Sequence, residues 1–429
     1  MFGPHSITDS PSSAQAMSGA HHMGVLRLAQ SLARVGRGLP ILAAMSASRE
    51  RLLSAFRKEF GRQPALVAEA PGRINLIGEH TDYNDGLVLP VAIDRTVAVA
   101  AAPGDGRYLR VLALDYNERD EFTLDDIACI RNGGWRSYVR GVFWALQDAG
   151  CEIPGADLAI TGDVPQGAGL SSSAALEVAV AGALTALSGR EVARRDLALL
   201  CRRAENDFAG VQSGIMDQFA AALSQPAQAL FIDCRSLEVE YVPLPLEQEA
   251  VDIVAVDSGV ARRLGDTPYN ERRRECAEAA KFLAVASVTD ANWEMLAAAR
   301  PSLPERLFRR ARHVISENKR VREAADSLRR ADLTTLGALL RASHESLRDD
   351  FEVSTPELDL LVELAWSTEG VIGARLTGAG FGGCTVNLVH RAALSRFDRD
   401  VLLPYREQTG LSAASYACRP AAGLTVGHV

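Results

Sequence analysis

The sequence predicts an α+β fold in two or three domains. With 429 residues the chain is too long for one small core, because a domain averages about 150 residues. Apolar runs typical of strands are interspersed with stretches whose apolar residues recur at helical spacing. The apolar fraction of 47% and the charged fraction of 23% are ordinary for a soluble globular protein. We therefore expect helices and strands to be packed together in each domain.

The composition argues against several classes of protein. The net charge is −8 and no basic stripe dominates, so we expect no nucleic-acid partner. Apolar runs stay shorter than a bilayer span, so we expect no membrane partner. The seven cysteines are an odd number without a CxxC pair, which favours reduced thiols over a disulfide framework or a zinc site. We expect a cytoplasmic protein that acts as a monomer.

Residues 1–47 differ from the rest of the chain. They open with Ser, Pro, Gly and His clusters and continue into an apolar part that contains arginines and almost no acids. A transit peptide would have such a composition, whereas Arg27, Arg34 and Arg37 interrupt the apolar core that a secretory signal needs. The simplest interpretation is a poorly ordered extension that results from an upstream start codon.

The first half of the chain combines strands with helices. Ser48–Phe60 carries apolar residues at helical spacing, and Leu158 alternates with Ile160 in a strand over Asp157–Thr161. Further elements are expected as strands within Ala65–Pro103 and at Tyr108–Ala113, as helices at Ser137–Gln147 and Arg195–Phe208, and as a hairpin of Ala229–Cys234 with Glu238–Val242. Pro243–Glu249 is the expected linker. The domains are therefore predicted at 48–242 and 243–429.

The second half repeats the mixture with more helix. Strands are expected at Val251–Val256, Val371–Leu376, Cys384–Val389 and Ala413–Ala417, and helices at Tyr269–Phe282, within Asp290–Asp350, and at Pro356–Trp366 and Ala392–Arg406. We interpret Arg272, Arg273 and Arg274 as a solvated helix face. His313 and His344 are interpreted as surface or hydrogen-bonded histidines, so the region Asp290–Asp350 receives no chemical role.

The stretch Ala70–Asp85, APGRINLIGEHTDYND, combines several kinds of polar group on one support. Arg73 follows a Pro-Gly turn, and the polar residues Glu79, His80 and Asp82 follow an apolar strand. Several donors and acceptors held close together suit a sugar, which presents many hydroxyls. The alternative is an ordinary charged loop after a strand.

Gly162–Leu176, GDVPQGAGLSSSAAL, indicates an anion site. Gly167 and Gly169 permit close backbone approach, and Ser171–Ser173 then open an Ala-rich helix whose free N–H groups and dipole attract phosphate. The alternative is a Gly-rich turn with serine caps. Thr377–Gly383, TGAGFGG, is a second such loop, for which a tight connection between strands is an equal alternative.

Two acids remain ambiguous from the residues alone. Asp217 begins a helix in GIMDQ, and Glu205 lies near the end of the preceding helix. An acid in a first helical turn is ordinarily a surface residue that the dipole favours. Nothing in the local pattern distinguishes these two from that case.

Three motifs resemble those of a known family. GRINLIGEHTDYNDGLVLP is similar to the galactokinase signature, VPQGAGLSSSAALEVAV to the ATP-binding motif of the GHMP kinase superfamily, and LTGAGFGGCTVNLV to its third motif. The first motif is specific to galactokinases, and the other two are shared with mevalonate and homoserine kinases. The resemblance covers about Ser48 to the C-terminus and leaves out the N-terminal extension.

The resemblance implies both a fold and a reaction. The N-terminal domain would be like ribosomal protein S5 domain 2 and the C-terminal domain ferredoxin-like, with the active site between them. The reaction would be phosphorylation of α-D-galactose at its anomeric hydroxyl by MgATP, giving galactose 1-phosphate. Galactose and ATP are thus the expected partners and Mg²⁺ the expected cofactor.

The matching motifs also imply residue roles. The resemblance implies that Asp217 is the catalytic base and that Arg73 is its cationic partner. It implies a sugar site of Glu79, His80, Thr81, Asp82 and Tyr269, and Mg²⁺ ligation by Ser173 and Glu205. The implied ATP site consists of Gly167, Ala168, Gly169, Leu170, Ser171, Ser172 and Ser173. A positioned carboxylate that accepts the proton of a sugar hydroxyl contributes roughly 10²–10⁴-fold. Arg73 would either keep this carboxylate ionised or stabilise the transferring phosphoryl group.

The sequence departs from the family pattern near Tyr269. The usual Ser-Glu before this tyrosine is Thr267-Pro268, and the histidine that is common upstream of it is missing, with Arg262 and Arg263 nearby. The alternatives are therefore a related sugar-1-kinase that acts on N-acetylgalactosamine, arabinose or a uronic acid, and a non-catalytic sugar sensor. The intact Ser172–Ala175 stretch disfavours the sensor.

Overall fold

The computed structural model describes residues 39–130, 133–260 and 268–429. The chain divides into two units, Met1–Ser54 and Ala55–Val429, and the division falls within helix α2 (Leu39–Phe60). This helix begins at Leu39, earlier than the expected Ser48, so it includes residues that we had placed in the extension. Residues 1–38 of that predicted extension lie outside the described residues.

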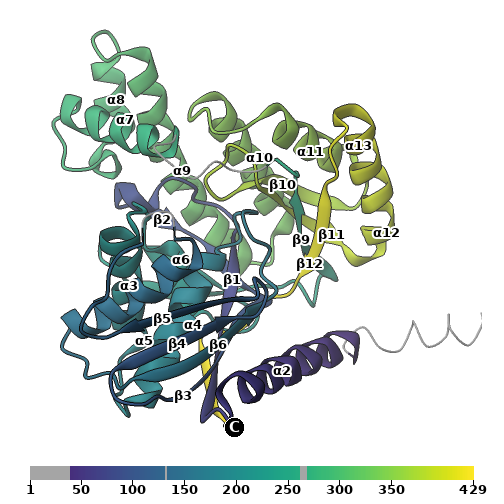
Figure 1. Cartoon of the computed structure of the whole chain (residues 1–429). Coiled ribbons are helices and arrows are strands. Elements are labelled where there is room, and N and C mark those ends of the chain that lie inside the picture. Colours follow the sequence, from purple (N-terminus) through teal and green to yellow (C-terminus); the bar gives the residue numbers. More distant parts are fainter. Residues whose placement is uncertain (1–38, 131–132, 261–267) are drawn as a thin grey trace, which may run out of the picture. The chain divides into compact units, whose positions relative to one another are not determined.

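Within the unit Ala55–Val429, a six-stranded sheet contains the first strands of the chain (Figure 1). Its order is β13 (Thr425–His428), β1 (Leu66–Asn75), β3 (Pro90–Pro103), β6 (Ala156–Gly162), β4 (Tyr108–Ala113) and β5 (Glu118–Thr123). Only the β4–β6 pair is parallel. The last strand of the chain thus joins the sheet that the first strands form.

Four helices accompany this sheet: α3 (Trp135–Asp148), α4 (Ser172–Leu187), α5 (Arg194–Arg203) and α6 (Met216–Leu223). Helix α4 packs on β1 and β3, and every residue from Ala174 to Thr185 is buried. Its many alanines explain this burial, because small side chains let the helix approach the sheet closely. The anion-site motif at its N-terminus is therefore fixed to a rigid core.

A second sheet is antiparallel throughout and has the order β10 (Val371–Thr377), β11 (Cys384–His390), β9 (Val251–Asp257) and β12 (Ala414–Cys418). Helix α11 (Pro356–Ser367) packs on it. The expected helix Ala392–Arg406 is a succession of short helices, namely η4 (Arg391–Ala393), α12 (Leu394–Phe397), η5 (Asp398–Leu402) and α13 (Leu403–Thr409).

The remaining elements are a helical group and a small sheet. The helices are α7 (Pro268–Phe282), η3 (Val288–Asp290), α8 (Trp293–Ala299), α9 (Glu305–Arg329) and α10 (Leu333–Asp349). The small sheet has the order β2 (Leu87–Val88), β7 (Gln228–Asp233) and β8 (Val239–Pro243). Two short helices at the site are η1 (Asp82–Asn84) and η2 (Ala204–Ala209). Much of α9 is buried, including His313 and Glu317.

One interpretation of this helical group needs correction. Arg272 is not on a solvated face: it is buried, and its guanidinium donates to the carbonyl oxygens of Phe351 at 2.7 Å and Glu352 at 3.0 Å. The guanidinium satisfies two backbone acceptors, which local sequence does not reveal. His313 and His344 are buried and hydrogen-bonded, which confirms the second of the two alternatives offered for them and excludes a surface position.

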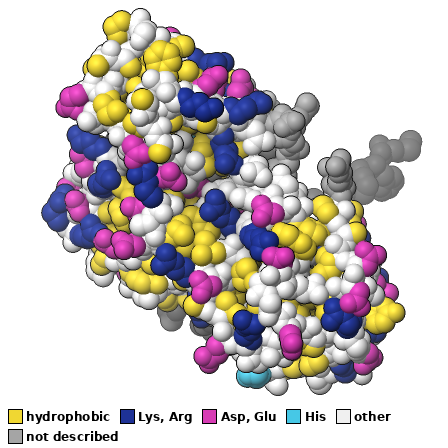
Figure 2. All heavy atoms as spheres, turned by 90° about the vertical axis from the view of Figure 1, so that its left-hand side faces the viewer, with side chains coloured by type: hydrophobic (Ala, Val, Ile, Leu, Met, Phe, Trp, Pro, Cys, Tyr) yellow, Lys and Arg dark blue, Asp and Glu magenta, His cyan; other side chains and the backbone are white. Residues whose placement is uncertain are grey.

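On the face drawn in Figure 2, basic and acidic side chains are interspersed. Within residues 39–130, 133–260 and 268–429, no helix combines the length and the apolar character needed to cross a membrane.

Candidate active site

Arg73 and Asp217 form the centre of the site. Arg73 lies in β1, where the pairing with β3 shifts register, and its side chain is buried. Its Nε and Nη2 donate to Oδ1 and Oδ2 of Asp217, each at 2.8 Å. Such a bidentate pair fixes both the position and the orientation of the carboxylate. Asp217, in the first turn of α6, keeps 26% of its side chain exposed, so the fixed carboxylate remains accessible.

The anion-site motif contacts this pair directly. The Ser171 hydroxyl donates to Asp217 Oδ2, and Arg73 Nη1 donates to the Gly169 carbonyl at 2.6 Å. Ser171 precedes α4 with a φ of +60°, in the left-handed region that L residues other than Asn and Asp adopt infrequently. Gly72 approaches the Leu170 carbonyl so closely that a Cβ would lie 2.7 Å from its oxygen. The motif after β6 and the motif in β1 are thus parts of one site.

The residues predicted for ATP binding divide into two groups. Gly167 is exposed and Ser172 and Ser173 are half-buried, and the free N–H groups of the first turn of α4 lie beside them. The side chains of Ala168 and Leu170 lie in the core, with 1% and 0% exposed. Ala168 and Leu170 therefore offer a ligand only their backbone. Gly167 and Gly169 have φ values of +72° and +81°, which explains the glycines at these positions.

Ser173 and Glu205 lie together as expected. The Ser173 hydroxyl is 3.3 Å from Glu205 Oε1, while Ser213 and Gln218 donate to Glu205 Oε2, the latter at 2.8 Å. Burial raises the pKa of Glu205. Among the described residues no group of three or more His, Cys, Asp or Glu side chains is clustered as metal ligands. A Ser hydroxyl with one carboxylate is nevertheless a hard-oxygen pair that suits Mg²⁺, which keeps several waters.

Glu79 is the most enclosed of the predicted sugar-site residues. Only 1% of it is exposed, and its carboxylate is paired with Arg375. It also accepts hydrogen bonds from the Gly378 N–H and the Asn75 amide, both at 2.8 Å. These contacts tie the first motif to the third, because Arg375 and Gly378 belong to β10 and the loop that follows it. A direct contact of Glu79 with a sugar stays a prediction.

Thr81 is fully buried. Its hydroxyl lies 2.8 Å from the Gly78 carbonyl oxygen and 2.7 Å from that of Leu87. The Thr81 hydroxyl thus holds together the two ends of the segment 78–87. Its predicted contact with a substrate likewise stays a prediction.

His80 and Tyr269 meet in an aromatic group. The His80 ring is 5.7 Å from Tyr269, 5.8 Å from Tyr83 and 4.8 Å from Phe351, measured between ring centroids. Its Nδ1 lies 2.8 Å from the Tyr83 hydroxyl and its Nε2 lies 3.2 Å from the Ala379 carbonyl oxygen. The structure therefore brings His80, from the first motif, beside Tyr269 at the start of α7. Most of the unusual segment before Tyr269 lies outside the described residues, and only Pro268 is described.

Asp82 is half-buried and lies against the chain just before Asp217. A Cβ built on Gly214 would be 1.8 Å from Asp82 Oδ2, so only glycine leaves room for this carboxylate. Burial raises the pKa of Asp82 to about 6, and the negative charge of Asp217 contributes. The close approach to Gly214 places Asp82 beside the segment that leads into Asp217.

Some residues of the site escaped sequence reasoning. Gln218 is fully buried, and its amide donates to Glu205 at 2.8 Å and to Glu177 at 3.1 Å. Burial, with the charge of Glu205, raises the pKa of Glu177 well above the ordinary carboxyl range. The sequence feature that could have identified Gln218 as a site residue is its position directly after Asp217. Arg375 and the buried face of α9 were also missed, because neither belongs to a polar cluster in the sequence.

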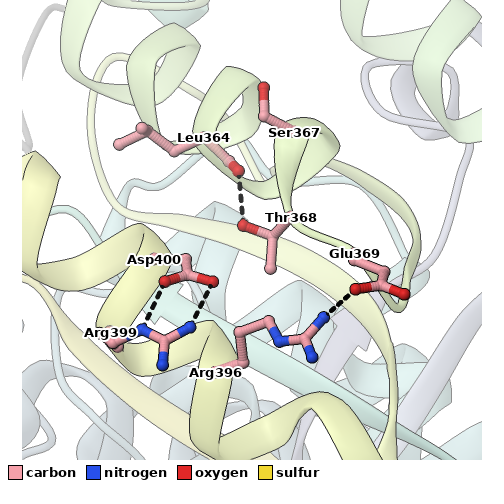
Figure 3. A pocket seen from close by; sticks show the side chains of 7 residues that line it. All are labelled: Leu364, Ser367, Thr368, Glu369, Arg396, Arg399 and Asp400. Carbon is pink, nitrogen blue, oxygen red and sulfur yellow. Dashed lines mark hydrogen bonds and ion pairs between the residues drawn. The ribbon is translucent and has the colours of Figure 1, made fainter.

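A surface hollow elsewhere contains none of the predicted site residues (Figure 3). It is lined by Leu364, Ser367, Thr368, Glu369, Arg396, Arg399 and Asp400. Arg396 pairs with Glu369, and Arg399 pairs with Asp400 at 2.7 Å. Its arginines are therefore already neutralised by neighbouring acids.

Family models match three parts of the chain. They are the galactokinase galactose-binding signature over residues 54–103, the GHMP kinases N terminal domain over 137–225 and the GHMP kinases C terminal domain over 324–399. The first range contains Arg73 and the loop with Glu79, and the second contains the anion-site motif and Asp217.

Curated relatives and solved structures agree with these matches. The chain is 48% identical to a galactokinase of Roseiflexus sp. (strain RS-1) over 87% of this chain and 96% of that protein. A galactokinase of Chloroflexus aggregans is 44% identical over the same shares. The crystal structure of Lactococcus lactis galactokinase complexed with galactose matches with a TM-score of 0.85 and 38% identity, over 88% of this chain and 99% of that one. The fold is shared with the Methanococcus jannaschii mevalonate kinase, whose structure matches with a TM-score of 0.62. The identity is 20%, over 84% of this chain and 99% of that one.

Proposed function

Since this chain belongs to the galactokinase family and is an ATP-dependent sugar kinase, we propose that it transfers the γ-phosphoryl group of ATP to the anomeric hydroxyl of α-D-galactose. The products are galactose 1-phosphate and ADP. One observation carries the assignment of roles: an accessible aspartate, held by an arginine and a serine, lies beside the N-terminus of α4 and beside the galactose-signature loop.

Asp217 acts as the general base. Its carboxylate takes the proton of the anomeric hydroxyl as that oxygen bonds to the γ-phosphorus, while the bond from phosphorus to the bridging oxygen of ADP breaks. The contacts with Arg73 and Ser171 support this role, because they fix the carboxylate without covering it. A positioned base contributes roughly 10²–10⁴-fold to such a step.

Arg73 has two tasks that its geometry combines. Two of its nitrogens orient Asp217, and the third binds the Gly169 carbonyl of the anion-site motif. The same guanidinium therefore sets the distance between the base and the place of the phosphates. Its positive charge also stabilises the negative charge that accumulates on the transferring phosphoryl group.

The phosphates of ATP bind at Gly167–Ser173. The first N–H groups of α4 lack helical acceptors and, together with the helix dipole, favour an anion there. Ser172 and Ser173 add hydroxyl groups beside these N–H groups. A global positive field is absent from a chain of net charge −8, so this local site must supply the attraction.

In this proposal Ser173 and Glu205 would hold Mg²⁺. When bound, Mg²⁺ would supply positive charge that offsets the charge of the ATP phosphates. The hydroxyl and the carboxylate oxygen, 3.3 Å apart, are of the hard type that this ion prefers. Ser213 and Gln218 occupy the other carboxylate oxygen, so Glu205 presents Oε1 toward Ser173.

The sugar site is formed by Glu79, His80, Thr81, Asp82 and Tyr269. Asp82 offers a carboxylate to sugar hydroxyls, and His80 and Tyr269 form an aromatic wall. Glu79 and Thr81 act chiefly by shaping the loop, since their present partners belong to the protein.

Incubation with a sugar panel and MgATP tests this function. The panel contains galactose, N-acetylgalactosamine, arabinose and a uronic acid, and the phosphorylated position is identified by NMR. We expect turnover of galactose with phosphate at the anomeric oxygen. Turnover of another sugar without galactose would identify a sibling kinase, and absence of ADP release with every sugar would identify a sensor.

A further inference from the structure

Side chains of helix α9 bind the backbone of the sugar loop, which we define as residues 76–87. The Gly78 N–H donates to Glu317 Oε1 at 2.9 Å, and the Leu87 N–H donates to Asn318 Oδ1 at 2.8 Å. The Nε2 atom of His313 lies 3.1 Å from the Glu79 carbonyl oxygen. The loop is therefore bonded to α9 on both sides of His80 and Asp82.

The contact of His313 has a defined direction. A carbonyl oxygen only accepts, so Nε2 carries the proton and Nδ1 accepts from the Ser346 hydroxyl at 2.9 Å. Burial lowers the pKa of His313 to about 4, so the ring is neutral at neutral pH. A neutral ring with one donor and one acceptor matches these two partners.

Glu317 is a fixed acceptor. It is fully buried, and Arg320 Nε donates to its Oε2 at 2.7 Å while the Ser343 hydroxyl donates to its Oε1 at 2.6 Å. Despite burial, the charges of Arg320 and its other neighbours lower the pKa of Glu317 to about 2. The carboxylate that holds Gly78 is thus ionised and cannot rotate freely.

The loop also packs closely against α9 at two glycines. A Cβ on Gly86 would lie 2.6 Å from Asn318 Oδ1, and a Cβ on Gly78 would lie 3.0 Å from Val321 Cγ2. Phe351 then connects the two histidines, since its ring is 4.8 Å from His80 and 4.6 Å from His313. Polar contacts, close packing and ring contacts therefore all join α9 to the sugar loop.

We propose that α9 is a positioning element of the sugar site, in which Glu317, His313 and Asn318 set the placement of His80 and Asp82 through the backbone of the sugar loop. This inference rests on the proposed function. Recognition of sugar hydroxyls requires side chains held within about 0.5 Å, and a loop whose backbone were bonded only to water would not provide this. Among the residues that the structure describes, no hydrogen bond joins α9 to Gly167–Ser173, so the two substrates should respond differently.

Steady-state kinetics of Glu317→Ala and Glu317→Gln test the proposal. The alanine variant loses the acceptor for Gly78, so we expect KM for galactose to rise about tenfold with KM for ATP unchanged. The glutamine variant keeps an oxygen acceptor, so it should restore most of the affinity for galactose. Asn318→Ala removes the acceptor for Leu87 and provides the same test should Glu317→Ala fail to fold.

The matched control is Glu323→Gln, because Glu323 is exposed on the same helix and pairs with Lys319. It should leave both KM values unchanged. Equal increases in both KM values, or identical kinetics of the alanine and glutamine variants, would overturn the proposal. Turnover of galactose by the wild-type protein tests the proposed function separately, so a failure of either one can be recognised.

Discussion

At the scale of single residues, the site depends on how one carboxylate is held. Asp217 is ambiguous in the sequence, since an acid in a first helical turn needs no special explanation. In the structure it accepts two hydrogen bonds from Arg73 and one from Ser171. Three donors on one partly exposed carboxylate exceed what a surface acid needs, and they fix its orientation.

Asp217→Asn should fold and lose turnover. The amide is nearly the same size but cannot accept the sugar proton, so we expect kcat to fall roughly 10²–10⁴-fold. Circular dichroism should remain that of the wild type. Asp326→Asn, on the exposed side of α9, serves as the control with unchanged kcat. Near wild-type turnover in the Asp217 variant would show that another group is the base.

The affinity for galactose should depend on pH through Asp82. Burial and the charge of Asp217 raise the pKa of Asp82 from 3.8 to about 6, so the carboxylate takes a proton as the pH falls through 6. A protonated Asp82 is a poorer acceptor, and we expect KM for galactose to be roughly tenfold higher near pH 5 than near pH 7. Asp82→Asn should abolish this dependence.

The raised pKa of Asp82 also makes the stability of the protein depend on pH. The folded state binds the proton of Asp82 more tightly than the unfolded state does. The contribution of Asp82 to the free energy of unfolding therefore decreases as pH rises from about 4 to about 6.

For the KM prediction, an identical pH profile of the wild type and Asp82→Asn would assign the pH dependence of KM to another group.

At the scale of elements, short irregular segments place the chemistry at the ends of long regular ones. Glu205 lies in the π-helical turn η2 that follows α5, and Asp217 begins α6 shortly after it. The connecting segment contains Gly214, whose absent side chain makes room for Asp82. The packing of η1 against this segment therefore determines how far the sugar site lies from the base.

Gly214→Ala should weaken galactose binding selectively. A Cβ would lie 1.8 Å from Asp82 Oδ2, so the carboxylate must move. Loss of its hydrogen bonds corresponds to a rise of about 10- to 100-fold in KM for galactose, with KM for ATP retained. Gly427→Ala is the control, since nothing lies within 4 Å of a Cβ there. An unchanged KM in the Gly214 variant would mean that Asp82 does not contact the sugar.

At the scale of the unit Ala55–Val429, one buried ion pair connects distant parts of the chain. Arg375 in β10 is fully buried and pairs with Glu79, and it also donates to the Leu76 carbonyl at 2.8 Å. The first motif is thereby fixed to the strand that leads into the third motif. The Gly-rich loop Thr377–Gly383 is thus part of the sugar site's support, since its Gly378 N–H also binds Glu79.

Arg375→Met should destabilise the protein strongly. Removing one partner leaves the Glu79 carboxylate buried without its counterion, which costs about 3–5 kcal/mol in the free energy of unfolding. Arg396→Met is the matched control, because its pair with Glu369 is exposed and contributes about 0–1 kcal/mol. Denaturant titration measures both variants. Equal decreases in the free energy of unfolding would show that the buried pair contributes no more to stability than the exposed pair.

Much of the fold could be predicted because its elements carry local patterns. The strand at Asp157–Thr161 and the Ala-rich helix after Ser171 appear as β6 and α4, and the hairpin appears as β7 with β8. The pairing of β13 with β1 was not predicted, because four exposed residues near the C-terminus have no apolar alternation to reveal a partner. Arg272 was misjudged for a related reason, since its acceptors lie in a distant loop.

The sequence by itself determined the family and the chemical groups, because Arg73, the sugar loop and the serines after Gly169 are contiguous motifs in which spacing carries the information. The resemblance already implied that Arg73 is the partner of Asp217, and the tertiary structure gave the geometry of this pair. Only the tertiary structure decided that α9 and Arg375 support the sugar loop. Gly78 and Glu317 are 239 residues apart. Contacts across such separations arise from packing of whole elements, and no local periodicity records them.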